Sequence, residues 1–341
     1  MAKINVGIIG IGTMGQLHLK NASFLANVVA CADPSAKVQK KLKSHNISIY
    51  SDYLDLLKRK DLDAVIISLP THLHKDCVIR CAERNVDMFV EKPLGLSLEE
   101  CKVMIQAVKK HGCKLMVNHN FRYHPIVENL KSQYDIGAIG EVDTGTFELV
   151  INGPFTAGSN PAPIPEWHLD RDKIGGGCMF DSGYHLVDLF CWIFDNPTPS
   201  VLYVEMTKRL DLPYEDSCLT ILKTKNTKGF LNVGWYCMNP GMKEDFRVIL
   251  HGTAGYLTTD DYNPEIYFNA LKEGFKNILR RFAGRRIHPL AYYPFMSSYF
   301  KTLSIFLKCV EKEETPPISG KEALNVVSIL EVIYNEQGNN K

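Results

Sequence analysis

The sequence predicts an α/β protein of two domains: an N-terminal doubly wound parallel sheet, and a C-terminal α/β domain with a large open, mostly antiparallel sheet. Short Val- and Ile-rich runs alternate with helix-period segments as far as about residue 118. After Pro125 the apolar runs follow one another with fewer helices between them. The length of 341 residues also suits two domains of roughly 150 residues each.

The first half alternates expected strands with expected helices. We expect strands at residues 4–9, 28–32, 47–50, 64–69, 87–90 and 114–118. We expect helices at residues 13–22, 35–44, 53–57, 72–84 and 97–111. Because a short link cannot join parallel strands, continuous apolar strands separated by helices indicate a parallel sheet covered on both faces.

The second half contains a series of strands and two closing helices. We expect strands at residues 141–151, 201–208, 217–223, 229–236 and 246–251. Ser319 and Glu322 have capping-box spacing before the last helical run, 323–334. Residues 152–177 are rich in Gly and Pro without a clear period, and a loop of this length inside a compact domain is usually functional.

Composition and charge exclude several classes of protein. The 39 Lys and Arg residues against 38 Asp and Glu leave a formal net charge of +1, so no overall field draws the chain to nucleic acid or to an anionic membrane. The 10 cysteines contain no Cys-x-x-Cys pair, which favours reduced thiols. No signal-peptide pattern is present, and no apolar run approaches the ~18 residues of a transmembrane helix. We therefore expect a cytoplasmic protein.

A glycine motif follows the first expected strand. Residues 10–15 read Gly-Ile-Gly-Thr-Met-Gly, at the mouth of the first expected helix. Gly10 permits a tight turn, Gly12 lets the backbone approach a pyrophosphate, and Gly15 allows close packing of helix on strand. The motif predicts a dinucleotide-binding turn.

Asp33 ends the second expected strand, about 20 residues after Gly12, at the spacing of a carboxylate that hydrogen-bonds the adenosine ribose. Its charge would repel a 2′-phosphate, so the sequence favours NAD over NADP, although Lys37 leaves NADP open. Alternatively, Asp33 followed by Pro34 caps the next helix.

Two groups of residues are candidates for chemistry. Glu91-Lys92-Pro93 follows the strand at 87–90, at the carboxyl end of the sheet, and the Lys92 ammonium can hydrogen-bond an oxygen that becomes negative during hydride transfer. Asp181 and His185 are four residues apart in a helix-period segment, so at ~100° per residue they share one helix face. Histidine suits proton transfer at neutral pH. By themselves these motifs also fit a solvated loop and a structural Asp–His pair.

The motifs, in order, resemble the Gfo/Idh/MocA oxidoreductases, which are named for glucose-fructose oxidoreductase and inositol dehydrogenase. The resemblance covers nearly the whole chain and rests on Gly10 to Gly15, Asp33, Pro70-Thr71-His72-Leu73-His74, Glu91-Lys92-Pro93, Gly176-Gly177 through Asp181 to His185, and Pro316 to Gly320. It implies an NAD-binding Rossmann domain over residues 1–122 and a substrate-binding and oligomerisation domain over 123–341. The implied activity is hydride transfer between a nicotinamide cofactor and a secondary alcohol or ketone of a sugar, inositol or related polyol. The implied assembly is a homodimer or homotetramer formed through the open sheet.

The resemblance also implies residue roles. Lys92, Asp181 and His185 take the catalytic positions: His185 accepts the hydroxyl proton, and the division of labour between Lys92 and His185 stays open. Cofactor contacts are expected from Gly10, Ile11, Gly12, Thr13, Met14, Gly15, Asp33, Leu69, Pro70, Thr71, His74, Glu91, Lys92 and Asn120. Substrate contacts are expected from Lys92, Arg122, Trp167, His168, Asp181 and His185.

Some positions depart from the family pattern and leave the substrate unnamed. Phe121 precedes Arg122 where some polyol-oxidising relatives carry another polar residue, and His168 follows Trp167 where many members have Trp-Arg. Tyr184, between the two catalytic positions, is bulkier than the usual aliphatic residue.

Two other classes of protein are alternatives. A metal hydrolase would use His72 with His74, His119, His124, or Asp181 with His185 as ligands. His72 and His74 are two residues apart and do not face each other on a helix, and no His-Glu-x-x-His occurs, so no metal is expected. A non-catalytic NAD- or sugar-sensing protein is the stronger alternative, because a fold does not dictate activity.

Residues 271–288 form a basic amphipathic segment. Leu271, Phe275, Ile278 and Phe282 have helix-like spacing among six Lys and Arg residues. We expect a solvated helix packed on its apolar face, with a membrane surface, a partner or a phosphorylated substrate as alternatives.

Overall fold

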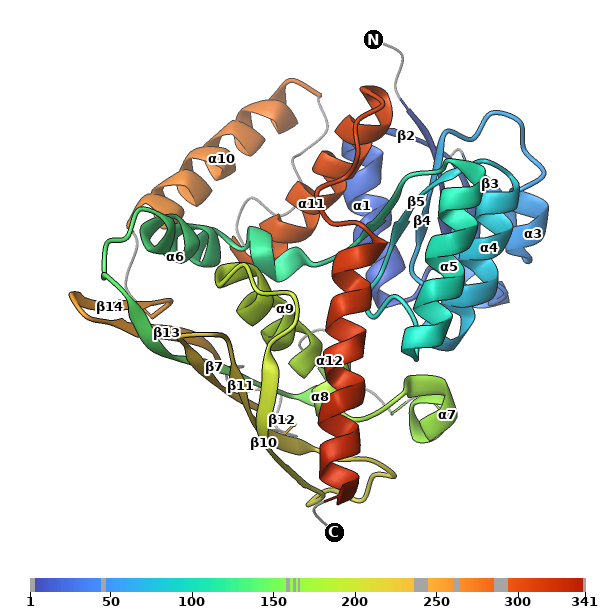
Figure 1. Ribbon diagram of the computed structural model, residues 1–341. Helices are drawn as coiled ribbons and strands as arrows, with labels where there is room; N and C mark the ends of the chain where they lie inside the picture. Colours follow the sequence, from blue (N-terminus) through green and yellow to red (C-terminus); the bar gives the residue numbers. More distant parts are fainter. Residues whose placement is uncertain are drawn as a thin grey trace. The chain divides into compact units, whose positions relative to one another are not determined.

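The computed structural model describes residues 4–43, 47–157, 160–161, 164, 166–235, 245–260, 264–284 and 294–339. The chain divides into two compact units (Figure 1). The first comprises Met1–Gly95, Glu99–His124 and Pro264–Lys321. The second comprises Leu96–Leu98, Pro125–Asn263 and Glu322–Lys341. A late segment of the chain thus returns to the unit that the first 124 residues build.

The first unit is built on a six-stranded sheet of order β3-β2-β1-β4-β5-β6, in which every neighbouring pair is parallel. The strands are β1 (Asn5–Ile9), β2 (Asn27–Ala32), β3 (Ser48–Tyr50), β4 (Ala64–Ile67), β5 (Asp87–Val90) and β6 (Leu115–Val117). The predicted parallel sheet is confirmed. The strand order reverses between β1 and β4, and in such folds ligands bind beyond the carboxyl ends of the strands at that point.

Helices cover both faces of this sheet (Figure 1). They are α1 (Thr13–Leu25), α2 (Ala36–Leu42), α3 (Tyr53–Leu56), α4 (His74–Glu83), α5 (Leu98–His111) and α11 (Pro294–Glu311), with the 3₁₀ turns η1 (Thr71–Leu73) and η2 (Asn120–Tyr123). Helix α10 (Pro264–Phe282) belongs to the same unit but does not lie on the sheet. Leu19 of α1 and Phe306 of α11 join Ile8 and Phe89 of the sheet in one buried core cluster. Burying each such side chain contributes roughly 1.5–3 kcal/mol, so these two helices are held to the sheet by their apolar faces.

The second unit contains a six-stranded sheet of order β10-β11-β12-β7-β13-β14. Its strands are β7 (Val142–Ile151), β10 (Ser200–Thr207), β11 (Ser217–Lys223), β12 (Lys228–Trp235), β13 (Asp245–Gly252) and β14 (Gly255–Thr258). Neighbours pair antiparallel in this sheet except β12 with β7, which confirms the prediction of a mostly antiparallel sheet. Phe147 on its inner face packs edge-on against Phe190, with ring centroids 5.6 Å apart.

The helices of the second unit are α6 (Pro125–Asp135), α7 (Arg171–Ile174), α8 (Cys178–Asp181), α9 (Gly183–Ile193) and most of α12 (Gly320–Asn339). The expected long loop contains the short elements η3 (Gly153–Phe155), β8 (Thr156–Ala157), β9 (Asn160–Pro161) and η4 (Glu166–Leu169). At the start of α12, Ser319 Oγ accepts a hydrogen bond from Lys321 N, two residues on, so Ser319 caps the helix. The reciprocal capping box with Glu322 stays a prediction.

The expectation that the basic segment packs on its apolar face is wrong for its described part. Leu271, Phe275, Ile278 and Phe282 of α10 are 72%, 63%, 50% and 88% exposed. Residues 285–288 of the segment lie outside the described residues.

Across the described residues, none of the helices has the length and apolar character needed to cross a bilayer. Nor does this part of the chain contain three or more His, Cys, Asp or Glu side chains arranged to hold a metal ion. The nine cysteines within it are free thiols, eight of them buried.

Candidate functional site

Two positions of the glycine turn after β1, Gly10 and Gly15, accommodate only glycine. Gly10 has φ +83°, and a Cβ there would lie 2.7 Å from Ser68 O. A Cβ on Gly15 would lie 2.0 Å from Gly10 O, so α1 starts in direct contact with the turn. Ser68 Oγ donates to Gly10 O over 2.7 Å, which ties the turn to the end of β4.

The start of α1 is open on the side of Gly12. Gly12 is the N-cap residue, no side chain caps the helix, and a Cβ on Gly12 would meet nothing within 4 Å. Thr13 and Met14 form the first turn of α1. Their backbone N–H groups have no partner within the helix and can therefore donate to an anion at its N-terminus. These residues therefore fit the pyrophosphate of a dinucleotide.

The Asp33 carboxylate lies beside this turn. Its Oδ2 accepts a hydrogen bond from Ile11 N over 2.8 Å, and its Oδ1 accepts one from Ser35 N over 2.9 Å. The helix-capping alternative is not what the structure shows, because Ser35 is the N-cap of α2 and its Oγ accepts from Val38 N. Asp33 is half-buried, and each of its oxygens has a further lone pair, so it can still accept from a ribose hydroxyl. The ribose contact stays a prediction.

The loop after β4 carries Leu69, Pro70 and Thr71, all half-buried, and leads into α4. The His74 ring is fully buried: Nε2 lies 2.8 Å from Leu69 O, and Nδ1 lies 3.0 Å from Pro93 O. Burial lowers the pKa of His74 below its usual value, so the neutral ring donates to one of these carbonyls. His74 thus joins the loop after β4 to the loop after β5, while its contact with a cofactor stays a prediction.

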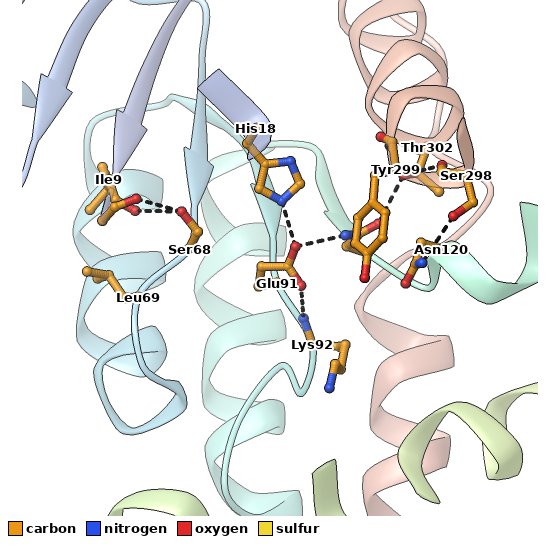
Figure 2. A network of polar contacts seen from close by, with 12 residues as sticks. Ile9, His18, Ser68, Leu69, Glu91, Lys92, Asn120, Ser298, Tyr299 and Thr302 are labelled. Carbon is orange, nitrogen blue, oxygen red and sulfur yellow. Dashed lines mark hydrogen bonds and ion pairs between the residues drawn. The ribbon is translucent and has the colours of Figure 1, made fainter. Parts of the chain in front are cut away.

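A buried polar network fixes Glu91 (Figure 2). His18 Nε2 lies 2.6 Å from Glu91 Oε1, and Asn118 Nδ2 donates to the same oxygen over 2.8 Å. Asn118 Oδ1 lies 3.0 Å from Thr302 Oγ1, which orients the amide so that its nitrogen faces Glu91. Burial raises the pKa of the Glu91 carboxyl, but the hydrogen bond and charge of His18 outweigh it, with Asn118 and Lys92 adding to the effect, and the pKa lies below its ordinary value.

Lys92 follows this fixed carboxylate directly. Its backbone N–H donates to Glu91 Oε2 over 3.3 Å, its peptide bond to Pro93 is cis, and its side chain is half-buried. Asn120 and Arg122 lie in the 3₁₀ turn η2 of the same unit, 1% and 9% exposed. Asn120 Nδ2 donates to Ser298 Oγ of α11 over 3.1 Å.

Sequence reasoning missed His18, and we expect its loss to be costly. His18→Leu should lower the free energy of unfolding by about 1–3 kcal/mol, because the buried Glu91 carboxylate loses a hydrogen bond. The matched control is Asn21→Leu on the same helix: Asn21 is also fully buried, yet its Oδ1 and Nδ2 have no hydrogen-bond partner among the described residues. Asn21→Leu should leave the free energy of unfolding, measured by urea denaturation, unchanged or higher. Equal losses in both variants would show that repacking of α1, and not the bond to Glu91, determines the cost.

In the second unit, Asp181 and His185 lie on two successive helices and not on one. Asp181 ends α8, Ser182 links the helices, and His185 N donates to Ser182 O, three residues back, over 3.1 Å. The predicted single helix is therefore divided at Ser182, although Ser182 keeps right-handed helical dihedral angles, φ −85° and ψ −40°. That Asp181 and His185 share one face stays a prediction. Ser182 Oγ accepts from Trp235 Nε1 over 3.1 Å and lies 3.4 Å from Asp181 Oδ2. His185 is 6% exposed and Asp181 is half-buried.

Sequence reasoning also missed Glu215, which holds the glycine-rich turn before α8. Its Oε1 accepts from Gly177 N over 2.9 Å, from Met179 N over 3.1 Å and from the Tyr334 hydroxyl over 2.6 Å. Burial raises the pKa of the Glu215 carboxyl, although these hydrogen bonds oppose the shift. The only local signal was a Glu-Asp pair just before an expected strand, which does not reveal a partner as distant in sequence as Tyr334.

Tyr214 is a third residue that the sequence did not single out. Its ring packs edge-on against Trp235, and its buried hydroxyl has no hydrogen-bond partner among the described residues. Burial, followed by the charges of Asp181 and Glu215, raises the pKa of Tyr214 to about 12. The Tyr214 hydroxyl is therefore a neutral donor available near Asp181.

We expect Glu215→Gln to make stability less dependent on pH. Because folding raises the pKa of this carboxyl, the folded state keeps a proton that the unfolded chain releases above its ordinary pKa of 4.5. This proton's contribution to the free energy of unfolding is fully present below pH 4.5 and is lost as the pH rises through the pKa of the folded state. Glutamine cannot ionise, so Glu215→Gln should remove that decline, while its Oε1 still accepts the same hydrogen bonds. Thermal melts from acid to neutral pH check this, with Glu205→Gln on the exposed side of β10 as control. A decline of equal slope in wild type and Glu215→Gln would contradict it.

Trp167 and His168 lie in η4, with ring centroids 3.9 Å apart, and both are half-buried. Their contact with substrate stays a prediction.

Family models match both halves of the chain. Residues 4–119 match the oxidoreductase family with an NAD-binding Rossmann fold, and residues 127–258 match the GFO/IDH/MocA C-terminal domain. The fold and its glycine turn therefore define an NAD-binding oxidoreductase. The chain belongs to the Gfo/Idh/MocA family.

Two curated relatives illustrate the similarity. An uncharacterized oxidoreductase, YrbE of Bacillus subtilis, is 32% identical over 203 residues, which are 58% of this chain and 56% of that protein. A myo-inositol 2-dehydrogenase of Thermotoga maritima is 25% identical over 332 residues, covering 94% of this chain and 92% of the relative.

A solved structure shows the same fold. GenD2 from gentamicin A biosynthesis, in complex with NAD, superposes with a TM-score of 0.82 over 100% of this chain and 96% of that one, at 18% identity.

Proposed function

We propose that this chain is an NAD-dependent dehydrogenase that interconverts a secondary alcohol and a ketone of a sugar, an inositol or a related polyol. One observation carries the proposal: the glycine turn, Asp33 and the fixed Glu91–Lys92 pair all follow parallel strands of one sheet, so they lie at its carboxyl edge. The relatives named as inositol 2-dehydrogenase and levoglucosan dehydrogenase support this substrate class.

The residues of this chain would act as follows. Gly10, Gly12 and the first turn of α1 bind the pyrophosphate, and Asp33 binds the adenosine ribose. Glu91 fixes the backbone from which the Lys92 side chain extends. NAD supplies the acceptor for the hydride that leaves the carbinol carbon.

In this proposal His185 and Asp181 carry out the proton transfer. His185 takes the hydroxyl proton on a ring nitrogen, and Asp181 stabilises the resulting cation. The Lys92 ammonium donates a hydrogen bond to the substrate oxygen as charge develops there. Oxidation thus removes one hydride from carbon and one proton from oxygen.

We further propose a cytoplasmic homo-oligomer that assembles through the outer face of the second sheet. Tyr203, Leu219 and Phe230 of that face are 44%, 39% and 37% exposed, a set of apolar side chains that a symmetric contact would cover.

A substrate screen tests the function. Purified protein with NAD is incubated with sugars, inositols and nucleotide sugars, and NADH absorbance is followed. We expect turnover with at least one polyol. Tight NAD binding without turnover on any of them would favour a sensor and overturn the proposal.

A further inference from the structure

Helix α10, drawn in orange in Figure 1, exposes most of its large apolar side chains. Besides the four residues given above, Phe268 and Leu279 are 67% and 54% exposed. At ~100° per residue, all six fall within an arc of about 100° on the helix surface. A contiguous exposed apolar stripe of this kind marks an interaction site.

The opposite side of α10 attaches the helix to its own unit. Asn277, opposite the stripe, is 3% exposed, and Gly274, near one border of the stripe, is also buried. Arg280 donates from Nη1 to Asn277 Oδ1 over 3.0 Å, and its guanidinium lies 6.0 Å from the ring centroid of Phe24 in α1. On this side the residues whose burial the structure describes are small or polar, while the apolar stripe is exposed, the reverse of an ordinary surface helix.

Positive charge borders the apolar stripe on both sides. By helical geometry the exposed residues Lys272 and Lys276 lie along one edge, and the exposed Arg281 lies along the other. Over Pro264–Phe282 the sequence has four Lys or Arg residues against two Glu. Such a stripe flanked by cations is the pattern of helices that lie in a membrane interface.

We propose that α10 docks the protein on an anionic lipid surface, with its apolar stripe in the headgroup boundary and Lys272, Lys276 and Arg281 on lipid phosphates. A second copy of α10 is a poorer occupant, because pairing two such stripes would bring basic edges together and like charges repel. With its cations, the helix lies on the bilayer and does not cross it.

Vesicle cosedimentation of the full chain tests the proposal. The probes are phosphatidylcholine vesicles with and without phosphatidylglycerol. We expect binding to the anionic vesicles that weakens with salt, and little binding to the neutral ones. The variant Phe275→Ser/Phe282→Ser should bind at least roughly tenfold more weakly, since each phenylalanine loses its apolar burial.

A charge variant and a control separate the two contributions. Lys272→Gln/Lys276→Gln/Arg281→Gln should lose about fivefold per cation and most of the salt dependence. Tyr256→Ser removes an equally exposed aromatic residue, 61% exposed, from the second unit and should bind as wild type does. NAD binding should stay unchanged in all three variants.

Three results would overturn the proposal. They are equal binding to neutral and anionic vesicles, binding that the α10 variants leave unchanged, and a wild-type self-association in sedimentation velocity that Phe275→Ser/Phe282→Ser abolishes. The last result would assign the stripe to a second copy of the chain.

Discussion

Replacing Lys92 by alanine is expected to lower kcat/KM for polyol oxidation by about 10²–10⁴-fold. The ammonium would stabilise the substrate oxygen only as it becomes negative, so its loss acts on the transition state more than on binding. In this variant Glu91 keeps its contacts with His18 and Asn118. The glycine turn at residues 10–15 is also unchanged, so NAD affinity should remain largely intact. Steady-state kinetics together with calorimetric titration of NAD measure both quantities.

The matched control is Lys102→Ala, which removes the same charge from the exposed side of α5. Lys102 is exposed and forms an ion pair with Glu99, 3.7 Å long, of a kind that contributes little. His185→Ala should lose turnover to a similar extent and also lose the limb of the pH–rate profile that its base contributes. Wild-type turnover in both Lys92→Ala and His185→Ala would refute the assignment of the catalytic residues.

Alanine at Gly15 is expected to abolish NAD binding and to destabilise the protein by at least about 3 kcal/mol. Its Cβ would lie 2.0 Å from Gly10 O, which is backbone and cannot move away without opening the turn. The melting temperature should fall by roughly 5–10 °C. Differential scanning calorimetry and NAD titration check the two effects.

Gly12→Ala, in the same turn, separates the effect on folding stability from the effect on NAD binding. Because a Cβ there would meet nothing within 4 Å, stability should change by less than about 1 kcal/mol. The added methyl group would occupy space that the pyrophosphate needs, so NAD affinity should fall at least about tenfold. Wild-type NAD affinity in Gly12→Ala would mean that the dinucleotide does not lie over this turn.

The local sequence pattern was sufficient to predict strands in which buried and exposed residues alternate. Residues 217–223 were expected as a strand and form β11, because Cys218 and Leu222 alternate with outward residues on a half-buried surface. The glycine motif could also be read from the sequence, since backbone geometry within one turn requires Gly10 and Gly15. Asp33 was singled out by its spacing alone, and in the structure it accepts a hydrogen bond from Ile11 N, 22 residues away. The strand expected at 64–69 ends at Ile67, where Ser68 instead donates its hydroxyl to Gly10 O.

Periodicity did not reveal the interruption at Ser182 or the direction in which α10 faces. Trp235, distant in sequence, donates to Ser182 Oγ, and the apolar stripe of α10 has the same period whether it packs inward or lies exposed. The supporting residues His18 and Glu215 escaped notice for the same reason: their partners Glu91 and Tyr334 are 73 and 119 residues away.

The amino-acid order by itself determined the α/β class, the parallel sheet, the dinucleotide turn and the candidate residues for chemistry, because these depend on backbone conformation and short-range periodicity. Only the tertiary structure decided which side chains hold those candidates in place and which helix face meets solvent. Such contacts join residues far apart along the chain, and their free energy depends on burial that no local pattern specifies.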